Sequence, residues 1–175
     1  MFLVHTIFFT KKEDAKIMST IKKSPFQIFV DADSCPVKNE TIDVALRHRI
    51  DVYIVSNGGI RPSTNPFVKT IVVDAGPDEA DNWIVQNIKK NDIVITTDIP
   101  LSAQSIENGA NVVAHNGENI DATNIGIKVA SRNLMTEIRS ADPFHKGKGR
   151  GFLKSDRVRY INSLEKIIQT TKKSL

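Results

Sequence analysis

Five apolar runs of six residues alternate along the chain with amphipathic segments. Most of the runs are apolar throughout and do not alternate with polar residues. They cover residues 26–31, 51–56, 69–74, 92–97 and 110–115. This pattern is typical of strands that are buried on both faces, as in a parallel sheet.

The segments between and after these runs have the periodicity of helices. We expect helices over residues 37–49, 77–90, 100–109, 122–140 and 155–171. In the first of them, Val37, Ile42, Ala45 and Leu46 fall on one face, and Pro36 suits the first turn. Strands that alternate with helices predict an α/β fold, with three α/β/α layers and a central, mainly parallel sheet of about five strands.

The length of 175 residues is that of one domain with tails. We expect a weakly structured extension over residues 1–24 and a single domain over residues 25–175. The start "MFLVHTIFF" is too short to span a bilayer and has no positive leader or cleavage site, and Met18 opens a stretch with the character of a natural start. The single cysteine excludes an internal disulfide, so a reduced, cytoplasmic protein is expected.

The net charge of +4 hides a strong asymmetry. Residues 26–144 hold sixteen acids against ten lysines and arginines, whereas residues 145–175 hold nine bases and two acids. One interpretation is a solubilising tail. The other is a basic arm that meets phosphate beside an acidic, metal-holding centre.

Acidic residues follow several of the predicted strands. Asp31 and Asp33 follow the first strand, Asp78 and Asp81 open the helix after the third, and Asp98 follows the fourth. In an open parallel sheet, ligands bind at the carboxyl ends of the strands, so these acids should meet at one edge. Crowded carboxylates repel one another unless they are protonated or share a cation. Mg²⁺ or Mn²⁺ is the cation that this oxygen-rich set predicts.

Each acid also has a structural interpretation. Asp98 can cap the helix that begins at Pro100, Glu79 can be an ordinary first-turn acid, and Asp74 can be a turn residue. Asp31 and Asp33 are harder to explain in this way. A charge at the end of a buried strand costs several kcal/mol unless it is paired or metal-bound.

Four other residues have side chains that take part in chemistry or in packing. Cys35 is expected to be structural, because Thr41 stands where a cysteine phosphatase loop needs an arginine. His48 is expected at the surface, and Trp83 in the core. His115, at the end of the fifth strand, is a candidate for contact with a phosphate or leaving group.

Four motifs together resemble the YaiI/YqxD family of small bacterial proteins, which is functionally uncharacterised. They are "VDADSCPV", "GPDEADNWIV", "DIVITTDIPLSAQSIENGA" and "RNLMTEIR", and the resemblance runs from about Phe26 to the C-terminal helix. It implies a PIN-like fold, which many metal-dependent nucleases share. The family's acidic positions would then fall to Asp31, to Asp81 with Asp78 beside it, and to Asp98 after Thr96, with Asp33 as an extra acid.

Three positions depart from the family's pattern. The family often has a second acid after "AD", where this chain has Asn82, and its "RD" is Arg132-Asn133 here; "TTDIP" stands for "TADIP". Two acids have therefore become amides. Asn82 would lower metal affinity if that position is a ligand.

The resemblance and the acids together favour a nuclease that depends on Mg²⁺ or Mn²⁺ and acts on RNA. Its catalytic residues would be Asp31, Asp81 and Asp98. Its metal ligands would come from Asp31, Asp33, Asp78, Asp81 and Asp98. Its nucleic-acid contacts would come from Arg132, Lys146, Lys148, Arg150 and Lys154.

Two other functions stay open at this point. One is a non-catalytic module that binds RNA or a partner on a PIN-like scaffold, since a fold does not guarantee a reaction. The other is a phosphatase of the haloacid-dehalogenase kind, with Asp31 as nucleophile and Asp33 as acid and base. That second alternative leaves "VITTDIP" without a role.

Overall fold

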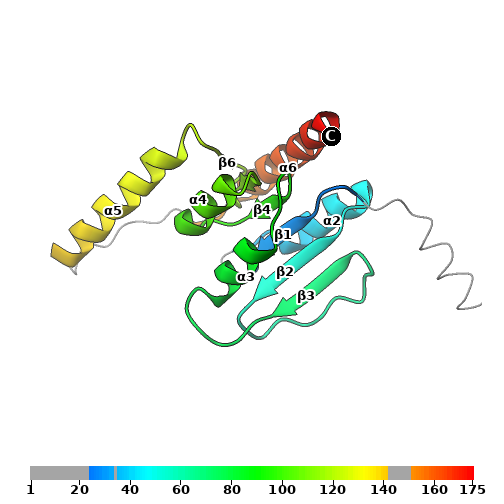
Figure 1. The fold of residues 1–175 in the computed structure, drawn as a ribbon, viewed down its shortest axis with the longest axis horizontal. Helices are drawn as coiled ribbons and strands as arrows, with labels where there is room; N and C mark the ends of the chain where they lie inside the picture. Colours follow the sequence, from blue (N-terminus) through cyan, green and yellow to red (C-terminus); the bar gives the residue numbers. More distant parts are fainter. Residues whose placement is uncertain (1–23, 34, 142–150) are drawn as a thin grey trace, which may run out of the picture.

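A computed structural model describes residues 24–33, 35–141 and 151–175. Its centre is a six-stranded sheet in the order β3-β2-β1-β4-β5-β6 (Figure 1). The strands are β1 (Ile28–Asp31), β2 (Val52–Ser56), β3 (Val68–Val72), β4 (Ile93–Ile95), β5 (Asn111–Val113) and β6 (Asn119–Ile120). All neighbours pair in parallel except β5 and β6, which are antiparallel. The predicted α/β fold with a mainly parallel sheet is confirmed, and the short β6 is an addition.

Helices cover both faces of the sheet. One face carries α2 (Lys38–His48) and α6 (Lys154–Ser174), and the other carries α3 (Glu79–Asn87) and α4 (Ile99–Glu107). Side chains alternate along β1, so Ile28 and Val30 pack under α2 and α6 while Phe29 packs under α3 and α4. The result is the three-layer α/β/α architecture of a PIN-like fold.

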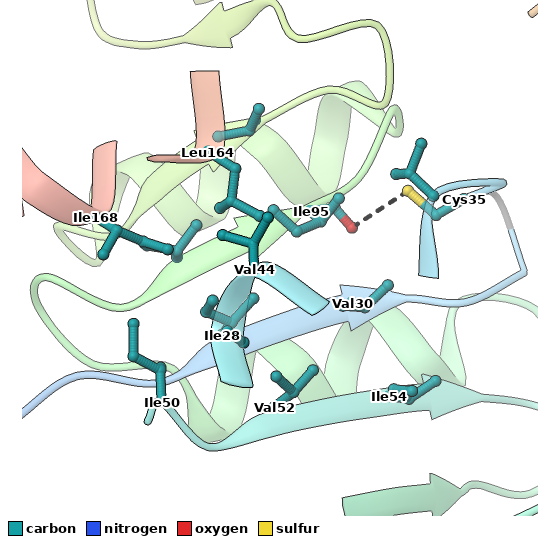
Figure 2. Close-up of a cluster of buried hydrophobic side chains, with 14 of the residues drawn as sticks. Ile28, Val30, Cys35, Val44, Ile50, Val52, Ile54, Ile95, Leu164 and Ile168 are labelled. Atoms are coloured by element: carbon teal, nitrogen blue, oxygen red, sulfur yellow. Dashed lines mark hydrogen bonds between the residues drawn. The ribbon is translucent and has the colours of Figure 1, made fainter. Parts of the chain in front are cut away.

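Figure 2 shows the larger of the two cores, between the sheet and helices α2 and α6. Ile28 and Val52 lie on neighbouring strands in register, and Val44, Leu164 and Ile168 close over this face of the sheet from the helices. Nearly every one of these side chains is fully buried. Burial of apolar surface at this density is the main stabilising term of such a domain.

Polar contacts join α2 to α6 above this core. Both carboxylate oxygens of Glu165 have a hydrogen-bond partner on α2. Arg47 Nη2 donates to one at 2.5 Å, and His48 Nε2 lies 2.5 Å from the other. The hydroxyls of Thr41 and Tyr160 lie 2.5 Å apart in the interior. His48, which was expected at the surface, is half-buried: its side chain is 14% exposed beside α6.

Helix α5 (Ile125–Ala141) differs from the others because none of its residues is buried. It lies next to α4 and projects from the body (Figure 1). Ile127 is 72% exposed and Leu134 is 56% exposed. The helix predicted over 122–140 is present, but several of its apolar side chains are exposed, whereas Ile125 packs against the core.

Two predicted features lie outside the described residues: almost all of the extension over residues 1–24, and most of the basic loop before α6. Within the described ranges, no helix combines the length and the apolar composition needed to cross a membrane.

Candidate acidic site at the carboxyl edge of the sheet

The site begins where β1 and β4 end side by side. Asp31 is the last residue of β1 and is only 5% exposed. The hydroxyl of Thr96, just after β4, donates to Asp31 Oδ2 at 2.9 Å and accepts the backbone N–H of Asp98 at 3.0 Å. One buried hydroxyl thus links the Asp31 carboxylate to the backbone that carries Asp98.

Asp98 is the N-cap of α4. Its Oδ1 accepts the backbone N–H of Leu101 at 2.9 Å, and its backbone is extended, as at most N-caps. The capping interpretation of Asp98 is therefore confirmed. The cap occupies one carboxylate oxygen in this way and holds the side chain at the start of the helix, beside the end of β4.

Asp33 is exposed but held in place from β2. Ser56 Oγ donates to its Oδ1 at 2.7 Å, and the backbone N–H of Asn57 donates to its Oδ2 at 3.1 Å. Ser56 is the last residue of β2, so two neighbouring strand ends share this contact. The turn after β1 is thereby tied to the turn after β2.

Helix α3 brings two further acids to the edge. Asp78 precedes the helix in a left-handed conformation, with φ of 63°, and Asp81 lies in its first turn. Burial raises the pKa of Asp81 to about 6, and the charges of Asp31, Asp98, Asp78 and Asp33 add to the rise, in that order. The other four carboxylates are thus close enough to Asp81 for their charges to oppose its ionisation.

Cys35 lies beside the same edge but is not a reactive thiol. Its Sγ donates to the backbone oxygen of Ile95 at 3.8 Å (Figure 2). Burial, together with the negative charge of Asp31, raises its pKa to about 12. A thiol held protonated in this way is a poor nucleophile, which agrees with the structural role expected for it.

The basic residues expected to bind nucleic acid are only partly described. Lys146, Lys148 and Arg150 lie outside the described residues. Lys154 is the exposed first residue of α6, and Arg132 is exposed on α5.

His115 and Trp83 have packing contacts of their own. The His115 ring lies 5.5 Å from that of Phe152, next to the first turn of α6. The Trp83 ring lies against Phe29 and Tyr53, with centroids 6.3 and 6.2 Å away, so the core position expected for it is confirmed on that side.

Sequence reasoning gave no role to the two hydroxyls that organise the edge. Thr96 and Ser56 are buried, and each is bonded to a carboxylate of a different segment. Their position at strand ends was a usable signal. Their partners depend on which strands are neighbours, which chain order alone does not specify.

The donor set suits a hard cation, because it consists of carboxylate oxygens whose mutual repulsion a cation would relieve. Among the described residues, however, no three His, Cys, Asp or Glu side chains are arranged to hold a metal ion. Binding would require some of these side chains to turn toward a common point.

The fold and this edge define the class: an α/β/α protein of PIN-like architecture with an acidic carboxyl edge. A family profile described as "Uncharacterized BCR, YaiI/YqxD family" matches residues 29–170. The chain belongs to that family, as its motifs predicted.

Relatives with similar sequences carry only a family designation. A UPF0178 protein of Roseobacter denitrificans is 52% identical over 142 residues, which cover 81% of this chain and 94% of the relative. Those of Ruegeria pomeroyi and Parvibaculum lavamentivorans are each 48% identical over 147 residues, covering 83% and 84% of this chain and 96% of each relative. No solved structure matches the chain.

Proposed function

We propose that the protein is a nuclease that depends on a divalent metal and acts on RNA. The observation that carries the proposal is the meeting of acids from three separate segments at the carboxyl edge of the sheet. Asp31 and Asp33 come from the end of β1, Asp81 from α3 and Asp98 from the start of α4. Ligand sites of open parallel sheets lie at this edge.

Asp31, Asp81 and Asp98 would hold Mg²⁺ or Mn²⁺, with Asp33 and Asp78 as further ligands or as orienting groups. When bound, such an ion lowers the pKa of a bound water and offsets charge on the scissile phosphate. The chain's own contribution is orientation: Thr96 holds Asp31, Ser56 holds Asp33, and the cap hydrogen bond holds Asp98. Rigid support of this kind keeps ligands in place.

The charge distribution supports a nucleic acid as the substrate. The C-terminal part of the chain, from residue 145, has a net charge of +7, whereas residues 26–144 have a net charge of −6. Lysines and arginines neutralise backbone phosphates, and this attraction weakens as salt rises. Lys154 and Arg132 are the described members of the proposed phosphate-binding set, with Lys146, Lys148 and Arg150 between them in sequence.

The test is cleavage of single-stranded and structured RNA by purified protein with Mn²⁺, compared with Asp31→Asn. Asp43→Asn is the matched control, because Asp43 is an exposed acid on α2, away from the site. We expect cleavage by wild type and Asp43→Asn and none by Asp31→Asn. Absence of cleavage at any pH, or equal activity of Asp31→Asn, would contradict the proposal.

A second candidate is a non-catalytic RNA-binding module on the same scaffold. The amides Asn82 and Asn133 at family acid positions favour it, as does the absence of a ready three-ligand metal arrangement among the described residues. Its signature would be tight RNA binding that is indifferent to divalent ions, with no turnover. Trapping of beryllium fluoride on Asp31 would indicate the phosphatase alternative.

A further inference from the structure

A cleft of about 310 Å³ lies between the end of β3 and α3. Residues 71–73 and Trp83 supply its apolar wall. Its polar lining comes from Asp74 on the loop after β3 and from Glu79, Asn82 and Gln86 on α3. The cleft begins at the carboxyl end of β3, an edge strand of the sheet.

The wall is apolar, and its tryptophan is held from behind. Ile71 and Val73 are half-buried and pack against the same core as Trp83, whereas the side chain of Val72 between them points to the opposite face of the sheet. The Trp83 ring is supported by Phe29 and Tyr53, which themselves stack at 5.0 Å. Aliphatic side chains beside a braced aromatic ring offer a surface on which a flat group can lie.

The polar lining selects against anions. It presents two carboxylates and two amides, and none of the described residues that line the cleft is a lysine, arginine or histidine. A phosphate would meet only like charge and amides there. An uncharged planar group that donates hydrogen bonds would meet two acceptors in Asp74 and Glu79.

The two amides are placed for paired contacts. Asn82 and Gln86 are one helical turn apart and are both exposed. Amide side chains pair with the amino group and ring nitrogen of adenine, and carboxylates accept from the amino group of cytosine. Asn82 also directly follows Asp81, so the cleft and the acidic site share the first turn of α3.

We infer that this cleft binds a nucleobase that carries an exocyclic amino group, beside the acidic edge. The inference takes its RNA substrate from the proposed function and names a binding site for it. It gives Asn82 a role of its own as a base contact. Adenine, cytosine and guanine offer an amino group to the carboxylates, whereas uracil presents two carbonyl oxygens and a single N–H, so uracil should bind most weakly.

Trp83 allows a direct test, because it is the only tryptophan of the chain. We would titrate the full-length protein with adenosine, cytidine and uridine and follow tryptophan fluorescence, with calorimetry as a second readout. Nucleosides lack phosphate, so this binding does not depend on a metal or on the proposed metal ligands, such as Asp31 and Asp98. We expect saturable binding of adenosine and cytidine, and at least severalfold weaker binding of uridine.

Variants locate the binding. The double variant Asn82→Ala with Gln86→Ala should bind adenosine about tenfold more weakly, as expected for loss of a paired amide contact. Gln104→Ala, which removes an exposed amide on α4, should bind like wild type. Equal affinity for all three nucleosides, no binding of any of them, or an unchanged double variant would overturn the inference.

The outcome is separable from that of the proposed function. Asp31→Asn should abolish cleavage and leave nucleoside binding intact. Selective nucleoside binding without any cleavage would contradict the proposed nuclease activity and support the base-binding cleft. Mn²⁺-dependent cleavage without nucleoside binding would support the nuclease activity and contradict the base-binding cleft.

Discussion

The hydroxyl of Thr96 donates a hydrogen bond of 2.9 Å to the carboxylate of Asp31, across the neighbouring ends of β4 and β1. Both residues are buried, and 65 positions separate them in the sequence. The same hydroxyl accepts the N–H of Asp98. This contact is the structural centre of the acidic edge.

Replacing Thr96 by valine keeps the shape of the side chain and removes both hydrogen bonds. We expect the free energy of unfolding to fall by roughly 1 to 3 kcal/mol, because a buried carboxylate loses a donor. Urea unfolding at neutral pH measures this loss of stability. Thr97→Val is the control, since Thr97 is the half-buried neighbour, and equal effects of the two changes would contradict the role given to Thr96.

The raised pKa of Asp81 predicts a pH dependence of stability. Its pKa rises from 3.8, the ordinary value for an aspartate, to about 6 in the folded protein, so the folded state binds more protons than the unfolded state between these values. The stabilisation is therefore complete below about pH 4 and is lost as the pH rises through 6. Asp81→Asn should gain stability relative to wild type from pH 4.5 to pH 7.5, by on the order of 1 kcal/mol, because Asp81 is partly exposed and solvent screens the repulsion. A constant difference across that range, in urea unfolding at both pH values, would show that the carboxylates are not crowded in solution.

A divalent cation should relieve the same repulsion. Adding Mn²⁺ should raise the melting temperature of wild type, since a ligand that binds only the folded state stabilises it, and each kcal/mol corresponds to about 2 to 4 °C at this size. Asp31→Asn should lose most of the shift, and Asp43→Asn should keep it. Identical shifts in all three proteins, measured by calorimetry with and without Mn²⁺, would place the cation elsewhere.

Two leucines test the difference between the core and α5. Leu164 is fully buried in the core of Figure 2, whereas Leu134 is 56% exposed. Leu164→Ala should lower the free energy of unfolding by about 2 to 5 kcal/mol. Leu134→Ala should change it by less than about 0.5 kcal/mol. A large effect at Leu134 in chemical unfolding would mean that the outer face of α5 is covered in solution.

The basic segment should govern the salt dependence of RNA binding. Replacing Lys146, Lys148, Arg150 and Lys154 by alanine should weaken binding and flatten its dependence on salt, because each of them can neutralise one phosphate. Folding should survive, since exposed charges contribute about 1 kcal/mol or less each. Filter binding at several salt concentrations measures the slope, and an unchanged slope would leave the segment as a solubility tail.

Local pattern was sufficient for the elements of the fold except the short β6. Continuous apolar runs such as residues 26–31 can be buried on both faces only in a covered sheet, so the α/β class and its parallel strands followed from the sequence. Shared strand polarity then predicted that the acids after β1 and β4 point to one edge. The cap at Asp98 was also readable, because a polar residue before Ile-Pro-Leu has a local partner in the backbone of Leu101.

Contacts between distant segments were decided only by the tertiary structure. Three hydrogen bonds depend on which strands or helices become neighbours. They join Ser56 to Asp33, Thr96 to Asp31 and His48 to Glu165. The exposed face of α5 and the cleft beside Trp83 were also not predictable from the sequence. Periodicity shows that a helix is amphipathic, but it does not show whether another element covers its apolar face. Local sequence sets backbone preference and burial pattern, whereas the packing of whole elements sets which polar groups meet.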